Sequence, residues 1–142
     1  MYLLDTCLIS ELVKAKPNKH VVQWLRGQSE FDCYLSVLTL GELEKGIGKL
    51  PTSKKRTQLE TWLHQDVRQR FQHRILNISS KTAEIWGKLQ AVAENTGQTL
   101  PVIDGLLAAT AKQHQMTLVT RNIKDFKGTE LALLNPWEMV KA

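Results

Sequence analysis

Apolar residues along this chain gather in short runs that alternate with stretches of helical spacing. Short unbroken apolar runs are typical of buried strands, whereas apolar side chains that recur every three or four positions predict amphipathic helices. In the first such pair, residues 2–4 lead into Leu8, Ile9 and Leu12. Because strands and helices alternate throughout, the pattern predicts an α/β fold with a parallel sheet. The predicted strands are residues 2–4, 33–37, 74–78, 116–120 and 131–134.

Polar residues and proline mark where the predicted helices begin. Thr39 is expected to cap the helix after the second strand, with Glu42 three residues later at the spacing of a capping box. Ser79 or Ser80 is expected to cap a later helix. Pro101 opens the next helix at a position where its missing N–H does no harm.

Length and composition fit one domain, residues 1–142. A domain of this size buries roughly 68–70% of the surface that its unfolded chain exposes, so it needs no disulfide. Cys7 and Cys33 lack metal-site spacing and are expected to be reduced packing residues, with a disulfide between them left open. No stretch approaches the ~18 apolar residues of a membrane span, and no basic segment precedes an apolar run at the N-terminus. We therefore expect a cytoplasmic protein without a membrane segment.

Four acidic residues stand where a strand passes into a helix or in the first turns of a helix: Asp5, Glu42, Asp104 and Asp125. In an open α/β sheet such positions converge at the carboxyl edge. Carboxylates crowded there repel one another and take up protons unless a cation neutralises them. Mg²⁺ or Mn²⁺ suits an oxygen-only set and can activate a water against a phosphodiester. The pattern predicts a divalent metal site.

Each of these carboxylates also has an ordinary structural explanation. Glu42 fits the return half of a capping box, Asp104 a partner of the helix dipole and Asp125 a solvated turn residue. Asp5 resists such an explanation best, because a carboxylate that closes a buried strand is costly without a partner.

Four segments resemble the motifs of PIN-domain nucleases, in the order and spacing of VapC-type toxins. They are residues 2–6, 36–43, 103–111 and 118–126, and the Asn-Pro-Trp sequence at 135–137 is similar to the FitB-like branch. The resemblance covers nearly the whole chain. It implies a three-layer α/β/α domain with a central, mostly parallel sheet, and a Mg²⁺- or Mn²⁺-dependent endoribonuclease that serves as the toxin of a type II toxin–antitoxin pair.

The resemblance also assigns roles to residues of the proposed site. Asp5, Glu42 and Asp104 match the three best-defined acids for metal binding and catalysis. The fourth place is shared by Asp125, expected as an acid, and Asn122, expected as a further or water-held ligand; which of them contacts the metal directly stays open. The two lie three residues apart, so one helical turn can aim both at the metal.

Small polar residues are expected to surround these acids. Thr6, Ser36 and Thr120 are candidates for hydrogen bonds to the acidic side chains, with helix or turn capping as the alternative for the first two. Many relatives carry Asn where this chain has Cys7. A thiol replaces the hydrogen bonds of an amide poorly, so we expect weaker metal binding or a shift toward softer ions, but not an inactive protein.

A surplus of basic residues, 19 Lys and Arg against 14 Asp and Glu, gives a net charge of +5 and favours polyanionic partners. Lys45, Lys49, Arg121 and Lys124 are expected to contact the RNA backbone near the acids, with a solvated surface as the alternative. If the rest of the basic block flanks the acids, it is also expected to hold the RNA backbone. Its residues are Lys54, Lys55, Arg56, Arg68, Arg70 and Arg74.

The resemblance implies a homodimer, silenced by a small VapB-like antitoxin that crosses a hydrophobic groove and inserts a basic side chain among the acids. The Leu12-Val13 face and the helix of Trp62 are candidates for that groove. Two other functions stay open. One is a PIN-like module that binds RNA or a partner without catalysis, and the other is a phosphatase or receiver-type protein in which Asp5 is phosphorylated.

Overall fold

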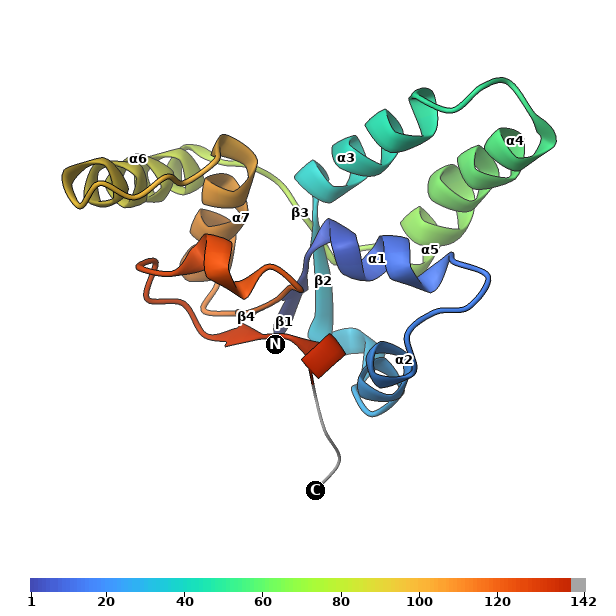
Figure 1. Ribbon diagram of the computed structural model, residues 1–142, viewed down its shortest axis with the longest axis horizontal. Coiled ribbons are helices and arrows are strands. Elements are labelled where there is room, and N and C mark those ends of the chain that lie inside the picture. The colour runs from blue at the N-terminus through green and yellow to red at the C-terminus, as the bar shows by residue number, and fades with distance from the viewer. Residues whose placement is uncertain (139–142) are drawn as a thin grey trace.

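The structure, a computed structural model, describes residues 1–138, so the last four residues of the predicted domain, 139–142, lie outside the described part. Its centre is a five-stranded sheet with the order β3-β2-β1-β4-β5, in which every neighbouring pair runs parallel (Figure 1). The predicted parallel α/β sheet is therefore confirmed. The strands are β1 (Tyr2–Leu4), β2 (Cys33–Ser36), β3 (Ile75–Leu76), β4 (Thr117–Val119) and β5 (Leu133–Leu134).

Helices cover both faces of the sheet, which confirms the predicted three-layer arrangement (Figure 1). One face carries α6 (Ser80–Asn95) and α7 (Val102–Gln113). The other face carries α1 (Thr6–Leu12), α2 (Lys19–Arg26), α3 (Val37–Gly48) and α4 (Lys54–Thr61), and α4 continues through the π-helical segment η2 (Trp62–Val67) into α5 (Arg68–Arg70). The 3-10 turns are η1 (Glu30–Asp32), η3 (Ile123–Phe126) and η4 (Pro136–Glu138). Within residues 1–138, no helix has the length and apolar character to cross a membrane.

Neighbouring residues of the two central strands point to opposite faces and so supply two hydrophobic cores. Leu4 and Val119 belong to the core beneath α1 to α4, whereas Leu3 and Leu118 belong to the core beneath α6 and α7. All four side chains are fully buried. Burying one such side chain contributes about 1.5–3 kcal/mol. Burial of all four side chains therefore stabilises the pairing of β1 with β4 at the ends of both strands.

Helix α3 begins earlier than predicted. Its N-cap is Ser36, whose hydroxyl oxygen accepts a hydrogen bond from the Leu38 N–H at 3.0 Å. The predicted cap at Thr39 is wrong, and so is the capping box with Glu42, because both residues lie inside the helix. The reason is that β2 runs into α3 without a loop, so the last strand residue itself provides the cap. At α6, Ser79 is the N-cap, which confirms Ser79 over the predicted alternative Ser80.

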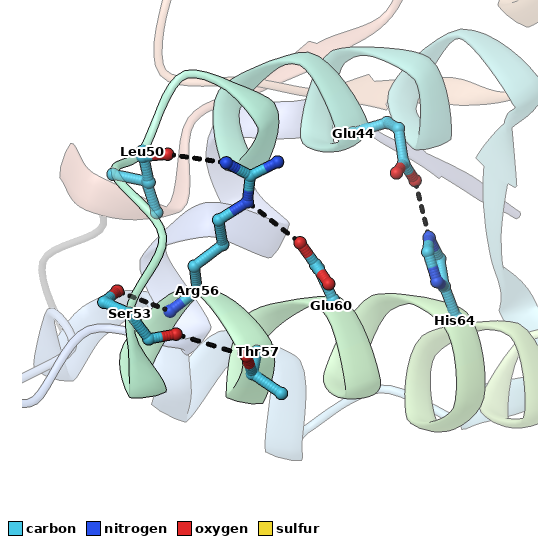
Figure 2. A network of polar contacts seen from close by, with 7 residues as sticks. All are labelled: Glu44, Leu50, Ser53, Arg56, Thr57, Glu60 and His64. Atoms are coloured by element: carbon cyan, nitrogen blue, oxygen red, sulfur yellow. Dashed lines mark hydrogen bonds and ion pairs between the residues drawn. The ribbon is translucent and has the colours of Figure 1, made fainter.

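Polar contacts hold α4 alongside α3 after the turn that joins them (Figure 2). Arg56 donates to the Leu50 carbonyl at 2.9 Å and pairs with Glu60 at 2.9 Å. His64 Nε2 lies 2.7 Å from Glu44 of α3. Exposed pairs of this kind typically contribute at most about 1 kcal/mol each. The Arg56–Glu60 pair lies within α4, whereas the His64–Glu44 pair links η2 to α3.

Candidate active site

The four predicted acids come from four elements that end near one edge of the sheet. Asp5 follows β1 and is the N-cap of α1, and Glu42 lies in the second turn of α3. Asp104 lies in the first turn of α7, and Asp125 lies in η3, the turn after β4. The charges of the other three all raise the pKa of Asp104. The other three acids therefore all lie within electrostatic reach of Asp104.

Asp5 is 7% exposed, and both of its carboxylate oxygens accept hydrogen bonds. The Thr6 N–H donates to Oδ1 at 2.7 Å, and the Thr120 hydroxyl donates to Oδ2 at 2.8 Å. Strand register explains the second contact. Because Leu4 of β1 pairs with Val119 of β4, the residues that follow them, Asp5 and Thr120, are also neighbours.

Cys7 lies beside Asp5, two residues further along the chain. Its thiol donates to Asp5 Oδ2 at 3.6 Å and accepts a hydrogen bond from the Arg121 backbone N–H at 3.5 Å. Burial, and then the charge of Asp5, raises the pKa of Cys7 to about 11, so the thiol keeps its proton at neutral pH. Cys7 thus links α1 to the segment after β4 through one donor and one acceptor, although hydrogen bonds to sulfur are weak.

Glu42 is connected to α1 through Thr6. The Thr6 hydroxyl donates to Glu42 Oε1 at 2.6 Å, and the hydroxyl of Thr39, one turn before Glu42, lies 3.3 Å from that of Thr6. Thr6 therefore contacts two acids, Asp5 through its backbone and Glu42 through its side chain. Ser36 is placed differently, since its buried hydroxyl caps α3, the alternative given for it from the sequence.

Asp104 is the most perturbed acid of the group. Burial is the largest cause, and the charges of Asp5, Asp125 and Glu42 add to it, which together raise the pKa of Asp104 from 3.8 to about 6. Near neutral pH this carboxyl group therefore still holds its proton part of the time. A cation bound here would favour the ionised form and release that proton.

The neighbour of Asp104 shows why α7 sits where it does. A Cβ added to Gly105 would lie only 3.0 Å from the Trp86 ring of α6. Absence of a side chain at Gly105 thus lets the first turn of α7 approach α6 closely, and this contact sets the position of Asp104.

Asn122 and Asp125 lie on an exposed turn. The Asn122 backbone N–H donates to the Thr120 hydroxyl oxygen at 3.1 Å, and the Asp125 N–H donates to the Asn122 carbonyl at 3.0 Å. Thr120 thus connects this turn to Asp5. Asp125 acts on Asp104 through its charge, whereas the Asn122 side chain forms no hydrogen bond within the described residues.

The donor set fits a hard divalent cation in chemistry and charge. In the described part of the chain, no three His, Cys, Asp or Glu side chains are already arranged to hold an ion. Mg²⁺, however, commonly contacts only one or two carboxylates directly and keeps several waters. Carboxylates at somewhat larger separations can therefore share a hydrated ion. The raised pKa of Asp104 reflects burial first and then the charges of neighbouring carboxylates, which such an ion would neutralise.

Two cavities, of about 470 Å³ and about 440 Å³, border the acids. The basic residues predicted to contact RNA divide between them, two to each cavity. The lining includes Lys45, Lys49 and Glu42 in the first, and Arg121, Lys124 and Asp125 in the second.

Other arginines of the predicted basic block have structural partners. Arg74 is 9% exposed and donates to the backbone carbonyls of Glu30, Cys33 and Arg70. Its guanidinium carbon also lies 5.0 Å from the centroid of the Phe71 ring. The hypothesis that Arg74 contacts RNA is therefore wrong, because this buried side chain instead joins the end of α5 to β2.

Two residues near the site are not anticipated from the sequence as site residues. Asn135 Nδ2 donates to the Arg121 carbonyl at 3.2 Å, and the guanidinium carbon of Arg121 lies 5.6 Å from the centroid of the Trp137 ring. The signal that was available is the Asn-Pro-Trp sequence itself, which matches the FitB-like branch but reveals no contact partner.

Comparison with known proteins gives a consistent result. The family profile described as PIN domain matches residues 2–130. The chain is 39% identical to Toxin FitB of Neisseria gonorrhoeae over 137 residues, which covers 96% of this chain and 99% of that protein. It is 35% identical to VapC ribonuclease Y4jK of Sinorhizobium fredii over 138 residues, 97% of this chain and 99% of that protein.

The fold is equally similar to that of a solved complex. The crystal structure of FitAcB from Neisseria gonorrhoeae matches with a TM-score of 0.93 at 38% identity, and the match covers 98% of this chain and 100% of that chain.

Proposed function

The chain belongs to the PIN-domain family, and on that premise we propose that it is a Mg²⁺- or Mn²⁺-dependent endoribonuclease, the toxin of a type II toxin–antitoxin pair. One observation carries the proposal: burial and three neighbouring carboxylates raise the pKa of Asp104 to about 6. A carboxyl group so perturbed by burial and by other acids is typical of a functional site. The name of the relative VapC ribonuclease Y4jK supports RNA as the substrate.

The acids and the hydroxyls have separate roles in this proposal. Thr6 and Thr120 keep Asp5 and Glu42 oriented, as outer hydrogen bonds do in metal sites. Asp104 would give up its residual proton to make room for the charge of a bound cation. Such a cation would lower the pKa of a water for attack and would neutralise charge on the leaving oxygen. The residues that would hold the ion are Asp5, Glu42, Asp104, Asp125 and Asn122.

Basic side chains in the two cavities would hold the RNA backbone on either side of the acids. Lys45 and Lys49 serve the first cavity, and Arg121 and Lys124 serve the second. Contacts to phosphate groups supply affinity and register but carry little base information. The choice of RNA is therefore expected to depend on other parts of the surface or on the shape of the RNA.

A chain that cuts cellular RNA needs a neutralising partner, and we propose a small VapB-like antitoxin, with the toxin as a homodimer. The name of the relative Toxin FitB supports the toxin role. The predicted Leu12-Val13 face supports this proposal in part. Leu12, Leu25 and Phe71 line a cavity of about 190 Å³ there together with the charged residues Arg26, Glu30 and Arg70, and Val13 is 39% exposed beside Leu12.

Cleavage of RNA by the purified chain, freed of any antitoxin, tests the proposal. A mixed RNA pool is incubated with Mg²⁺, with Mn²⁺ and with EDTA, for the wild type and for Asp5→Asn and Asp104→Asn. Asp66→Asn is the matched control, because Asp66 is an exposed carboxylate of η2 outside the acidic group. We expect cleavage by the wild type and the control that stops in EDTA and in both site variants.

Two other outcomes would point elsewhere. Binding of RNA without cleavage in any metal ion would favour the alternative, a PIN-like module that binds RNA or a partner. Acid-labile phosphate on Asp5 would favour a phosphoacceptor.

A further inference from the structure

The second cavity, on the Asp125 side of the acids, combines several cations with an arginine that the C-terminal segment holds in place. We propose that this cavity binds the phosphate group of the RNA nucleotide adjacent to the cleaved bond, and that Trp137 and Asn135 position Arg121 for this contact. The inference deepens the proposed ribonuclease function and rests on it. The lining residues that the argument uses are Arg121, Lys124, Asp125, Lys127, Asn135 and Glu138.

Charge favours an anion in this cavity. Arg121, Lys124 and Lys127 contribute three cations, against the carboxylates of Asp125 and Glu138. Asp125 also belongs to the acidic group that would face the metal ion, so its charge is directed to a cation as well as to this cavity. The cavity therefore carries a surplus of basic side chains and lies directly beside the acids. An RNA strand that crosses the metal site could contact these basic side chains through its phosphate groups.

Arg121 has a fixed relation to the acids through its backbone. Thr120, the residue before it, donates to Asp5 Oδ2 at 2.8 Å. The Arg121 N–H itself donates to the thiol of Cys7, which in turn donates to Asp5. The backbone of Arg121 is thus held next to Thr120 and Cys7, which both contact Asp5.

The C-terminal segment fixes Arg121 from the other side. Asn135 Nδ2 donates to the Arg121 carbonyl at 3.2 Å, and Asn135 Oδ1 accepts from the Trp137 N–H at 2.9 Å. The Arg121 guanidinium carbon lies 5.6 Å from the centroid of the Trp137 ring, within the range of a cation–π contact. The same Asn135 side chain therefore holds both the arginine and the ring that supports it.

Trp137 is itself anchored to a buried group. Its indole N–H donates to Glu11 Oε1 at 3.3 Å, and Glu11 is 5% exposed. These contacts restrict the Arg121 side chain before RNA binds. Binding of a phosphate then costs less side-chain entropy, which favours tighter binding.

The Arg121 guanidinium keeps its hydrogen-bond donors available. Within residues 1–138 it forms no salt bridge and no side-chain hydrogen bond. The guanidinium groups of Arg56, Arg70 and Arg74 are by contrast bonded to carboxylates or backbone carbonyls. A planar guanidinium that is stacked but unpaired suits bidentate contact with a phosphate group.

The test measures binding separately from cleavage. Fluorescently labelled single-stranded RNA is titrated in EDTA at several salt concentrations with the wild type, Arg121→Gln and Lys127→Gln. Lys112→Gln, an exposed lysine of α7, controls for the change in net charge. We expect Arg121→Gln to weaken RNA binding about tenfold. It should also lower the slope of log affinity against log salt by the amount expected for about one phosphate contact. Lys127→Gln should cause a smaller loss of affinity.

The positioning role has its own readout. Trp137→Leu should weaken binding in the wild-type background but have little further effect once Arg121→Gln is present, because the two changes remove the same contact. Trp137→Phe keeps a ring under the guanidinium and should recover most of the affinity. If Trp137→Leu fails to fold, Asn135→Ala is analysed in the same double-variant cycle. Additive losses in the cycle would overturn the positioning role.

The location beside the cleaved bond is tested with oligonucleotides shortened by one phosphate at a time from each end. Loss of the relevant phosphate should weaken binding to the wild type but not to Arg121→Gln. The inference would be overturned if the wild type cleaves RNA but Arg121→Gln and Lys127→Gln bind RNA as tightly as Lys112→Gln does. The proposed function would then still stand. A wild type that neither cleaves nor binds RNA would overturn both.

Discussion

Helix α1 has a buried carboxylate at each end, and the two have opposite surroundings. Asp5, at its start, is 7% exposed, and its charge acts on Asp104, as do the charges of Asp125 and Glu42. Glu11, near its end, is 5% exposed and accepts hydrogen bonds from the Lys14 ammonium at 3.0 Å, the Asn18 N–H at 3.0 Å and the Trp137 indole at 3.3 Å. Burial by itself pushes the pKa of Glu11 up, but these hydrogen bonds and the charge of Lys14 lower it overall.

The difference separates an acid that the chain itself neutralises from acids that, under the proposed function, bind a metal ion. At Glu11 the chain supplies its own cation and satisfies the carboxylate, so the group ties α1, the start of α2 and the C-terminal segment together. Around Asp5 and Asp104 the described chain supplies hydroxyl and backbone donors but further carboxylates in place of a cation. Such a set is complete only with a cation from outside, which is why we assign it to metal binding.

Removal of one charge from the acidic group should have the largest effect on RNA cleavage. Asp104→Asn should lower the rate of RNA cleavage by more than about a hundredfold, since even residues that only support a metal site often cost 10–100-fold. The same variant should unfold at an equal or higher temperature without metal, because one repulsive charge is gone. Parallel measurements of cleavage rate and melting temperature check both effects. Cleavage close to the wild-type rate would contradict the assignment.

The reverse result is expected for the structural acid. Glu11→Ala leaves the partly buried indole N–H and the Asn18 N–H without their acceptor, which typically costs about 1–3 kcal/mol of stability. Urea unfolding measures this loss, and Glu11→Gln, which keeps an acceptor oxygen, should lose less. The cleavage rate at saturating RNA should stay near the wild-type value. A large loss of that rate with unchanged stability would erase the distinction between the two acids.

A smaller effect is expected from the hydroxyl that orients Asp5. Thr120→Val keeps the shape of this fully buried side chain but removes the hydrogen bond to Asp5 Oδ2. Loss of an outer hydrogen bond of this kind should weaken Mn²⁺ binding about tenfold, as measured by calorimetry. Thr120→Ser, which keeps the hydroxyl, is the control, and equal affinities for the two variants would show that the hydroxyl does not act on the metal.

The smallest effect is a pH dependence that separates the two acids. Folding raises the pKa of Asp104 above its unfolded value, so the folded chain without metal holds a proton there that the unfolded chain has lost. On this account stability falls as pH rises from about 4 to 7 through the folded pKa. Glu11 behaves oppositely, because its pKa is lowered: its contribution is present above the unfolded value of 4.5 and is lost as pH falls through its folded pKa.

Urea unfolding in EDTA at pH 5 and pH 7 checks this sign for Asp104. The stability of the wild type relative to Asp104→Asn should drop between the two pH values, and added Mg²⁺ should reduce the drop. A relative stability that rises with pH would show that Asp104 is stabilised as an anion without metal.

Much of the fold could be predicted from the sequence because it depends on local periodicity. The strand and helix alternation and the parallel sheet follow from apolar runs and helical stripes. The start of α3 could not be predicted in this way. Thr39 and Glu42 have the spacing of a capping box, but the chain turns directly from β2 into α3 at Ser36, and burial of Thr39 inside the core outweighs its capping preference.

The gathering of the four acids around Asp104 could be predicted from the sequence, whereas their hydrogen bonds could not. Asp5 stands out because it ends a buried strand, whereas its contact with Thr120 depends on the register of β1 against β4, which no local pattern encodes. The burial of Glu11 and the contact of Trp137 with Arg121 likewise join residues far apart in the chain. Such contacts are properties of the assembled layers.

Binding of Mn²⁺ tests the central claim most directly, because it asks whether the separated acids act as one ligand set. Calorimetric titration at pH 7.5 should show binding by the wild type and by Asp66→Asn. Asp5→Asn and Asp104→Asn should each weaken that binding by more than about tenfold. Mn²⁺ affinity that both substitutions leave unchanged would contradict the account.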